Sequence, residues 1–562
     1  MRQGDRSCTR FLGVAVIAVL SAFALAPSTT AQGTGAASCD AFLPAPRTAG
    51  GRQVGPSSCR HQETTLSFEG RTFIRLDVGI DGTVDGYVPT TGDHKGYLTN
   101  APDLVFLQAA DAGPRVFAVA TYQRDKGAAM TVVFPRDASA WNGKMWLTAH
   151  GRGRSFNEGN MRPWDTLLDP ADPLGDLDKY DRLMLAKGYA LVKTYRSTPA
   201  APPDVPRTAS TQASPEIVAT LEDGTTVDYV ALNDSANYLK DFGDVARRIL
   251  ERRLGRAPQR TYFYGHSAGA RIGRGINYTP GLNRGRDGQA AFDGFLLDDP
   301  AAGTWLPVVM KDGRNVLFST EAEKAAYVPQ LEVWHQMYNN IWPVRRAPFL
   351  SDSYLANKRQ NAVILGEKGL TPKYRFYEVR GISHQGGETL RDGRQGEIQI
   401  LDLSKLMSSF IDMVDQWADQ GVSPPPSRSD WGPLGDTNGD GVLDRPALAF
   451  PEIACPLGVY YPYPNTTAGN TSFAPFGGAQ LEPLDRSNVF IDMNRNGVWD
   501  FRETASAAWQ RLGLLKTGEP LTRPAYVSCV QKAAGELRQS GFFSEQVAQS
   551  YVEQAKTVAL QP

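Results

Sequence analysis

Short apolar runs alternate with segments of helical periodicity from about residue 136 to residue 420, and this alternation limits the possible folds more than any other feature. The runs read KMWLTA, YALVKT, RTYFYG, FDGFLLDD, VPQLEVWHQ and YRFYEV. Between two of them, NYLKDFGDVARRILERRLG has apolar residues at helical spacing and closes on Gly255. Strands that alternate with helices predict an α/β fold, in which a mostly parallel sheet carries helices on both faces.

The segments on either side of this region have different patterns. Residues 32–135 contain stretches such as RTFIRLDVGIDGTVDGYV, where apolar and polar residues alternate and Asp-Gly pairs intervene, so we expect antiparallel strands. After residue 420 the chain reads GVSPPPSRSDWGPLG, which is typical of a linker. Residues 421–562 are then expected to form an extension with Asp- and Asn-rich loops and a helical tail from about Arg523.

The first 31 residues have the pattern of a secretory signal. Arg2, Arg6 and Arg10 precede an apolar run over residues 11–26, and small residues lead to a cleavage site after Ala31. The run is short for a membrane span of roughly 20 residues, although a retained N-terminal anchor stays open. We therefore expect a secreted or periplasmic protein with no membrane span after the signal is removed.

Charge and cysteine content agree with an exported protein. The 59 Lys and Arg and the 60 Asp and Glu give a net charge of −1, so no strong field favours a nucleic-acid partner. Four cysteines remain after the signal, and an even number predicts two disulfides. Of the three pairings, Cys39 with Cys59 and Cys455 with Cys529 closes the shorter loops and is the one we expect. The sequence leaves the oligomeric state open.

The stretch YFYGHSAGARIG contains a Gly-x-Ser-x-Gly pentapeptide centred on Ser267. A predicted strand precedes it and a predicted helix follows it, which is the context of a nucleophile elbow. Gly265 and Gly269 remove the side chains that would clash in so tight a turn. Ser267 is therefore the candidate nucleophile, and a structural serine in a strand–helix turn is the alternative.

A serine hydroxyl needs a general base to become a strong nucleophile. In elbow hydrolases the acid and the histidine follow the serine in the chain, and only His335 and His384 follow Ser267. His384 lies in a glycine-flanked loop directly after the last predicted strand, so it is the predicted base. His335 lies in an apolar strand and is expected to be a core histidine.

The acid is harder to choose. The loop after VPQLEVWHQ reads MYNNIWP and contains no carboxylate, but FLLDDPAAG, one strand earlier, ends in two aspartates. We predict Asp299 as the acid and keep Asp298 as the alternative, with Glu332 a weaker third candidate inside its strand. A turn or helix cap before Pro300 is the non-catalytic interpretation.

An oxyanion hole needs two N–H donors. One belongs to Ala268, the residue after the nucleophile. The second normally comes from the loop after an earlier strand, here AHGRGRS, so Gly151 and Arg152 are the candidates.

Four phrases in residues 141–387 resemble the α/β-hydrolase fold, including its tannase and feruloyl esterase branch: WNGKMWLTAHGRG, LAKGYALVKT, YFYGHSAGAR and VRGISHQGG. Tannases carry cysteines before the serine and beside the histidine; His266 and Gln385 or Gly386 stand there in this chain, so that disulfide is absent. LLDDPA is similar to the Leu-Asp-Pro-Ala of pancreatic-type lipases, which supports Asp299. The tail from FPEIACPLGVYYPYP resembles a poorly characterised α/β-hydrolase-domain family. The resemblance implies ester hydrolysis without specifying the ester.

Two loops have the pattern of a calcium-binding loop. DMNRNGVWDFRE matches it throughout, and its oxygen ligands would come from Asp492, Asn494, Asn496, the Val498 carbonyl, Asp500 and Glu503. DTNGDGVLDRPA matches less well because Ala447 stands where a glutamate is required, and it offers Asp436, Asn438, Asp440 and Asp444. We expect structural calcium, with metal-free Asx turns as the alternative.

These features together predict a secreted serine hydrolase that cleaves a small-molecule or polymer carboxylic ester through an acyl-enzyme. Catalysis by such a serine needs no cofactor. Two alternatives stay open: an amidase or peptidase of the same fold, and a non-catalytic, calcium-clamped binding protein on a hydrolase scaffold.

Overall fold

The computed structural model describes most of the chain between residues 37 and 560. The described residues are 37–49, 52–88, 105–107, 115–122, 130–149, 174, 177–194, 207–208, 216–220, 226–278, 281–285, 287–300, 305–311, 314–336, 358–359, 361–382, 384, 401–430, 446–462, 471–477 and 503–560. The predicted signal, residues 1–31, lies outside them. Among the residues described, no helix is both long enough and apolar enough to cross a membrane.

A 12-stranded sheet forms the centre of the molecule. Its order is β1-β3-β4-β7-β9-β8-β13-β14-β17-β18, with β2 paired to β3 and β6 to β4. The strands are β1 Ala37–Ser38, β2 Arg47–Ala49, β3 Arg52–Phe68, β4 Arg71–Val88, β6 Arg115–Tyr122, β7 Met130–Pro135, β8 Lys144–Ala149, β9 Ala190–Thr194, β13 Arg260–His266, β14 Gly294–Asp298, β17 Gln330–His335 and β18 Tyr374–Val379.

The sheet combines the two predicted patterns. Strands β3, β4 and β7 are antiparallel, and β7 pairs antiparallel with β9. From β9 through β8, β13, β14 and β17 to β18 every pair is parallel. The boundary drawn at residue 135 therefore falls within one continuous sheet. The mostly parallel sheet and the N-terminal antiparallel strands confirm the predicted α/β-hydrolase fold class.

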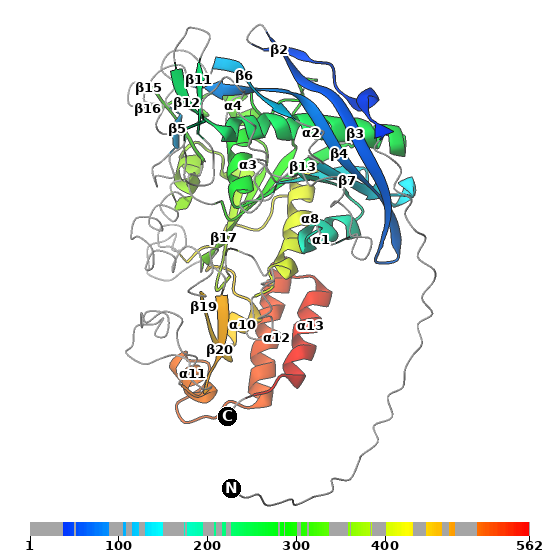
Figure 1. The fold of residues 1–562 in the computed structure, drawn as a ribbon. Helices are drawn as coiled ribbons and strands as arrows, with labels where there is room; N and C mark the ends of the chain where they lie inside the picture. The colour runs from blue at the N-terminus through cyan, green and yellow to red at the C-terminus, as the bar shows by residue number, and fades with distance from the viewer. Residues whose placement is uncertain are drawn as a thin grey trace, which may run out of the picture. The chain divides into compact units, whose positions relative to one another are not determined.

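Helices cover both faces of the parallel half (Figure 1). Neighbouring side chains of a strand enter opposite apolar clusters: Trp146 of β8 packs in the cluster that contains Met184 and Phe410, whereas Leu147 packs in the cluster that contains Phe242. The first cluster is built with α1 (Lys179–Ala186) and α8 (Ser404–Gln420), and the second with α2 (Ala231–Leu254) and α3 (Ala268–Tyr278). These helices bury nearly all residues of the parallel strands, as the apolar runs of the sequence predict.

Smaller elements complete the described chain. Two three-stranded sheets consist of β10 Arg207–Thr208, β11 Glu216–Thr220 and β12 Thr226–Val230, and of β5 Val105–Leu107, β15 Trp305–Lys311 and β16 Arg314–Asn315. Short helices are η1 Asp40–Phe42, η4 Ala138–Ala140, α4 Glu321–Ala326 and η5 Thr371–Lys373. The C-terminal extension contains α10 Pro451–Ala454, β19 Gly458–Pro462, β20 Thr471–Pro475, α11 Ala505–Arg511, α12 Arg523–Gln539 and α13 Glu545–Thr557.

The C-terminal extension packs against β18, the edge strand of the parallel half. Arg428 and Leu448 form parallel bridges to Tyr377 and Val379, and the N–H of Arg380 donates to the Leu448 carbonyl at 2.8 Å. The predicted helical tail is a pair of helices, α12 and α13, that lie side by side (Figure 1). The extension thus supports the strand that leads into the His384 loop.

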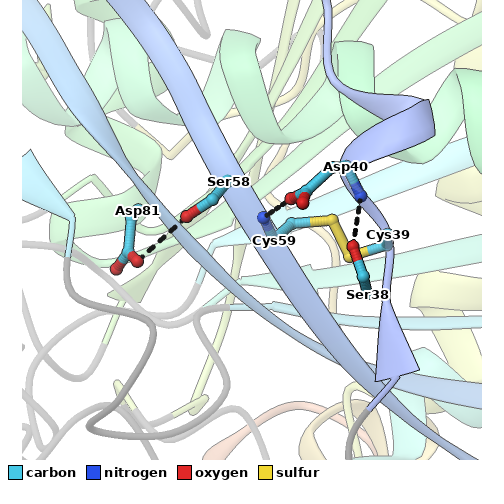
Figure 2. The surroundings of a disulfide bond; sticks show 6 residues. All are labelled: Ser38, Cys39, Asp40, Ser58, Cys59 and Asp81. Carbon is cyan, nitrogen blue, oxygen red and sulfur yellow. Dashed lines mark hydrogen bonds between the residues drawn. A yellow bond between two sulfur atoms is a disulfide. The ribbon is translucent and has the colours of Figure 1, made fainter.

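Both disulfides form in the predicted pairing. Cys39 and Cys59 are joined at a Cα–Cα distance of 5.0 Å, and Cys455 and Cys529 at 6.0 Å. Figure 2 shows Asp40 beside the first bridge, where one carboxylate oxygen accepts a 2.6 Å hydrogen bond from the Cys59 N–H. The second bridge ties the residue after α10 to α12 within the extension.

Candidate active site

The pentapeptide around Ser267 forms the tight turn between β13 and α3. Ser267 has a φ of 55°, in the left-handed region that non-glycine residues rarely adopt. A Cβ at Gly269 would lie 1.9 Å from the carbonyl oxygen of Ala149, and one at Gly265 would lie 2.5 Å from the Gly269 carbonyl carbon. The two glycines are therefore sterically required by this turn.

Ser267, His384 and Asp299 meet at the carboxyl ends of three parallel strands. His384 Nδ1–H donates to Asp299 Oδ2 at 2.5 Å, which leaves Nε2 to accept from the Ser267 hydroxyl at 2.9 Å. The serine and the histidine are 6% and 7% exposed, and the aspartate is fully buried. The three predicted residues thus form one continuous hydrogen-bonded chain.

The two candidate aspartates have separate partners. Asp299 follows β14 with a φ of 47° and faces His384. Asp298, the alternative acid, faces His335, whose Nε2 donates to Oδ1 at 2.7 Å, and Tyr264, whose hydroxyl donates to Oδ2 at 2.9 Å. Only Asp299 contacts the candidate base.

Asp299 accepts two further hydrogen bonds that the sequence did not suggest. Its Oδ1 accepts from the main-chain N–H of His335 at 3.1 Å and from the ammonium group of Lys358, which is fully buried. Burial by itself raises the pKa of Asp299, but the charges of Lys358 and His335 and the hydrogen bond from His384 outweigh it and hold that pKa well below its ordinary value. The carboxylate is therefore ionised at neutral pH.

His266 links the nucleophile turn to the His384 loop. Its Nε2 donates a 2.8 Å hydrogen bond to the main-chain carbonyl of His384, and the two ring centroids are 4.8 Å apart. A hydrogen bond therefore joins these two segments.

Glu332, the weaker third candidate for the acid, has a structural role. It lies fully buried within β17 and accepts hydrogen bonds from Arg274, Trp334 and Tyr374. Arg274 belongs to α3, so this carboxylate ties the helix after the nucleophile to the sheet.

The oxyanion-hole candidates are described only in part. Ala268 is the first residue of α3, so its N–H is one of those without an acceptor in its own helix. Gly151 and Arg152 lie outside the described residues. Their loop follows Ala149, whose carbonyl oxygen touches the elbow at Gly269.

The candidate calcium ligands fall almost entirely outside the described part of the chain. Asp492, Asn494, Asn496, Val498, Asp500, Asp436, Asn438, Asp440 and Asp444 are not in it. Glu503 is described, and both of its carboxylate oxygens accept from Arg511 Nε at 3.0 Å. Bidentate calcium coordination by Glu503 would compete with Arg511 for these two oxygens.

One described group of side chains has the composition of a metal site. Ligand atoms of Asp299, His335 and His384 lie within 4.8 Å of one another. Lys358 already places a positive charge against the same carboxylate, and His384 points its other ring nitrogen at Ser267. This arrangement suits proton transfer between Ser267 and His384 better than cation binding.

No protein-family model matches the sequence, and no curated protein is significantly similar to it. Among solved structures, the chain resembles esterase B from Lactobacillus rhamnosis (12% identity, 44% of this chain and 68% of that one, TM-score 0.23). It also resembles the poly(3-hydroxybutyrate) depolymerase LpqC from Bordetella parapertussis (13% identity, 53% of this chain and 87% of that one, TM-score 0.27). A third similar structure is EstA from Aspergillus niger (10% identity, 58% of this chain and 77% of that one, TM-score 0.28). Likenesses of this size carry no conclusion about activity.

Proposed function

We propose that the protein is a serine hydrolase that cleaves a carboxylic ester through an acyl-enzyme. The observation that carries this proposal is the hydrogen-bonded chain from the Ser267 hydroxyl through His384 to Asp299. A hydroxyl on a strained elbow, a histidine within hydrogen-bond distance and a buried carboxylate behind it are the parts that acyl transfer requires.

Each group has a defined part in the reaction. His384 Nε2 takes the Ser267 proton while the serine oxygen bonds to the carbonyl carbon. The Ala268 N–H, with Gly151 or Arg152, would stabilise the oxyanion of the tetrahedral intermediate. His384 then returns the proton to the alkoxide as the ester C–O bond breaks, leaving an acyl-serine. Water attacks the acyl-serine with the same base, and the acid and the free serine are released.

Asp299 stabilises the imidazolium that forms during each proton transfer. Because its carboxylate is buried and ionised, it interacts strongly with a positive charge on His384. An amide or peptide substrate would use the same steps, so an amidase is the second candidate. The non-catalytic alternative predicts no turnover at all.

Purified protein should be tested against short-chain, long-chain and hydroxycinnamoyl esters and against matched amides. We expect ester hydrolysis by the wild type and a loss of roughly 10⁴-fold or more in Ser267→Ala. Ser550→Ala, a substitution on α13 where the hydroxyl donates only to its own helix, is the matched control and should keep wild-type rates. Hydrolysis of amides alone would support the amidase.

We further propose an exported protein with structural calcium. Two disulfides support export, since such bonds persist in oxidising compartments. Calcium is supported by the sequence pattern of residues 492–503. Chelation with EGTA should lower the Tm, and calcium but not magnesium should restore it, with no change in the rate per folded molecule. A Tm that does not change when EGTA is added would contradict the calcium site.

A further inference from the structure

We propose that Lys358 is a positioning residue for Asp299. Together with Asp298 and His335 it forms a buried ionic layer that fixes the orientation of the triad acid and the charge next to His384. The name ionic layer refers to Asp298, Asp299, His335 and Lys358. This role rests on the proposed function, because it is exerted on the acid of that triad.

The hydrogen bonds to the Asp299 carboxylate fix its orientation. Oδ1 of Asp299 accepts from Lys358 and from the His335 N–H, while Oδ2 accepts from His384 at 2.5 Å. A carboxylate with one oxygen held by two donors cannot rotate without breaking both bonds. Lys358 therefore helps to decide which oxygen faces the base and at what angle.

The ionic layer brings groups of opposite charge together. Burial by itself lowers the pKa of His335, but the charges of Asp299 and Asp298 and the hydrogen bond to Asp298 raise it above the ordinary value. His335 Nδ1 lies 3.6 Å from Asp299 Oδ2 and makes no hydrogen bond within the described part of the chain. Two carboxylates thus face the ammonium group of Lys358 and the imidazole of His335, and all four side chains are fully buried.

The other titratable groups that face the layer are few among the residues described. The Tyr264 hydroxyl donates to Asp298, the His266 ring lies 6.3 Å from the His335 ring, and His384 bonds to Asp299. With the positive charge of Lys358 present, the layer attracts a positive charge on His384 less strongly than the two carboxylates alone would. Lys358 thus offsets part of the negative charge beside the candidate base, and a general base must be neutral to accept a proton.

A purely stabilising role explains the arrangement poorly. Moving two charges out of water costs more free energy than pairing them at the surface does. Replacing a buried ion pair with apolar residues is often neutral or stabilising for the fold. Here the buried cation contacts the carboxylate that holds the candidate base. The pair lies one hydrogen bond from the reacting groups.

Lys358→Met removes the donor and the charge while keeping much of the side-chain length. We expect kcat to fall about 10- to 100-fold with KM within about twofold, because Lys358 is fully buried behind Asp299. The acid limb of the kcat/KM profile should move to higher pH by about one unit. Lys358→Arg should leave the limb where the wild type has it.

The matched control is Lys368→Met, which removes a lysine that donates to the Asn315 carbonyl at 2.7 Å, away from the triad. It should leave kcat and the pH profile unchanged. A Lys358→Met enzyme with an unmoved acid limb, or with activity lost only in proportion to unfolded protein, overturns the proposal.

If Lys358→Met does not fold, His335→Gln provides the second test. It removes the imidazole but keeps the main-chain N–H that holds Asp299, and it should move the acid limb in the same direction; an unmoved limb overturns the proposal. A wild type that neither hydrolyses esters nor reacts with a fluorophosphonate would show instead that the proposed function fails, and the positioning role fails with it.

Discussion

His266, the residue directly before Ser267, donates a 2.8 Å hydrogen bond to the main-chain carbonyl oxygen of His384. The strand directly before the candidate nucleophile is therefore tied to the loop that carries the candidate base, although 117 positions of chain separate Ser267 from His384. In the proposed mechanism, this contact helps to hold the His384 ring at hydrogen-bond distance from Ser267.

His266→Ala should lower kcat about 10- to 100-fold, because small displacements of a catalytic group are costly. Ser267 and Asp299 keep their own contacts, so the protein should still react slowly with a fluorophosphonate. His61→Ala is the matched control: it removes a half-buried histidine from β3, and its kcat should equal that of the wild type. A wild-type rate in His266→Ala would show that the link has no catalytic consequence.

Mutation of the two aspartates should lower kcat to different extents. Asp299→Asn removes the charge that faces His384 and should lower kcat about 10²- to 10⁴-fold. Asp298→Asn should cost less than about tenfold, because its side chain contacts His335 and Tyr264 rather than His384, and the variant keeps the main-chain carbonyl that accepts from the Ser267 N–H. Steady-state kinetics with Tm as a folding check measures both. Equal losses in the two variants would contradict the assignment.

The sequence predicted the parts of the fold that depend on local pattern. Six apolar runs became the parallel strands, and Gly265 and Gly269 predicted the elbow, because periodicity and glycine sterics act over a few residues. Local pattern does not decide between Asp298 and Asp299, because it does not specify which distant residues each carboxylate meets; the contacts with His335 and His384 distinguish them.

Lys358 could not have been predicted. It stands in the polar run ANKRQ, which is typical of an exposed helix face, and its burial depends on segments distant in the chain. His335 was expected to be a core histidine, and it is buried as expected. Its contacts with Asp298 and Asp299 come from the pairing of β14 with β17, which no local pattern specifies.

Stability should depend on pH through His335. Its pKa is raised in the folded protein, so its contribution is fully present below about pH 6.5 and is lost as the pH rises through the folded value. The wild-type Tm should therefore fall more steeply than that of His335→Gln from pH 6.5 upward. Parallel Tm curves in differential scanning fluorimetry would contradict this.

The buried carboxylates act at the other end of the pH scale. The pKa values of Asp298 and Asp299 are lowered, so their stabilisation is present above about pH 4 and is lost as the pH falls through the folded values. Because Asp298→Asn removes one of these groups, its Tm should fall less than the wild-type Tm as the pH drops below 4. An equal loss of Tm in both proteins would contradict the ionised state of Asp298.

The two disulfides should contribute unequally. In the chain-entropy account, the bridge with a sequence separation of 74 contributes about 4 kcal/mol and the bridge with a separation of 20 about 3 kcal/mol. Chemical denaturation of the Cys455→Ala/Cys529→Ala and Cys39→Ala/Cys59→Ala variants compares them. The first variant should be less stable, and the reverse order would contradict the prediction.

The most direct test of the account is reaction of the purified protein with a fluorophosphonate, followed by peptide mass spectrometry. We expect one phosphonylated site, Ser267, with no adduct in Ser267→Ala and much slower reaction in His384→Ala. Absence of any adduct on folded wild-type protein, or an adduct on a different serine, would contradict it.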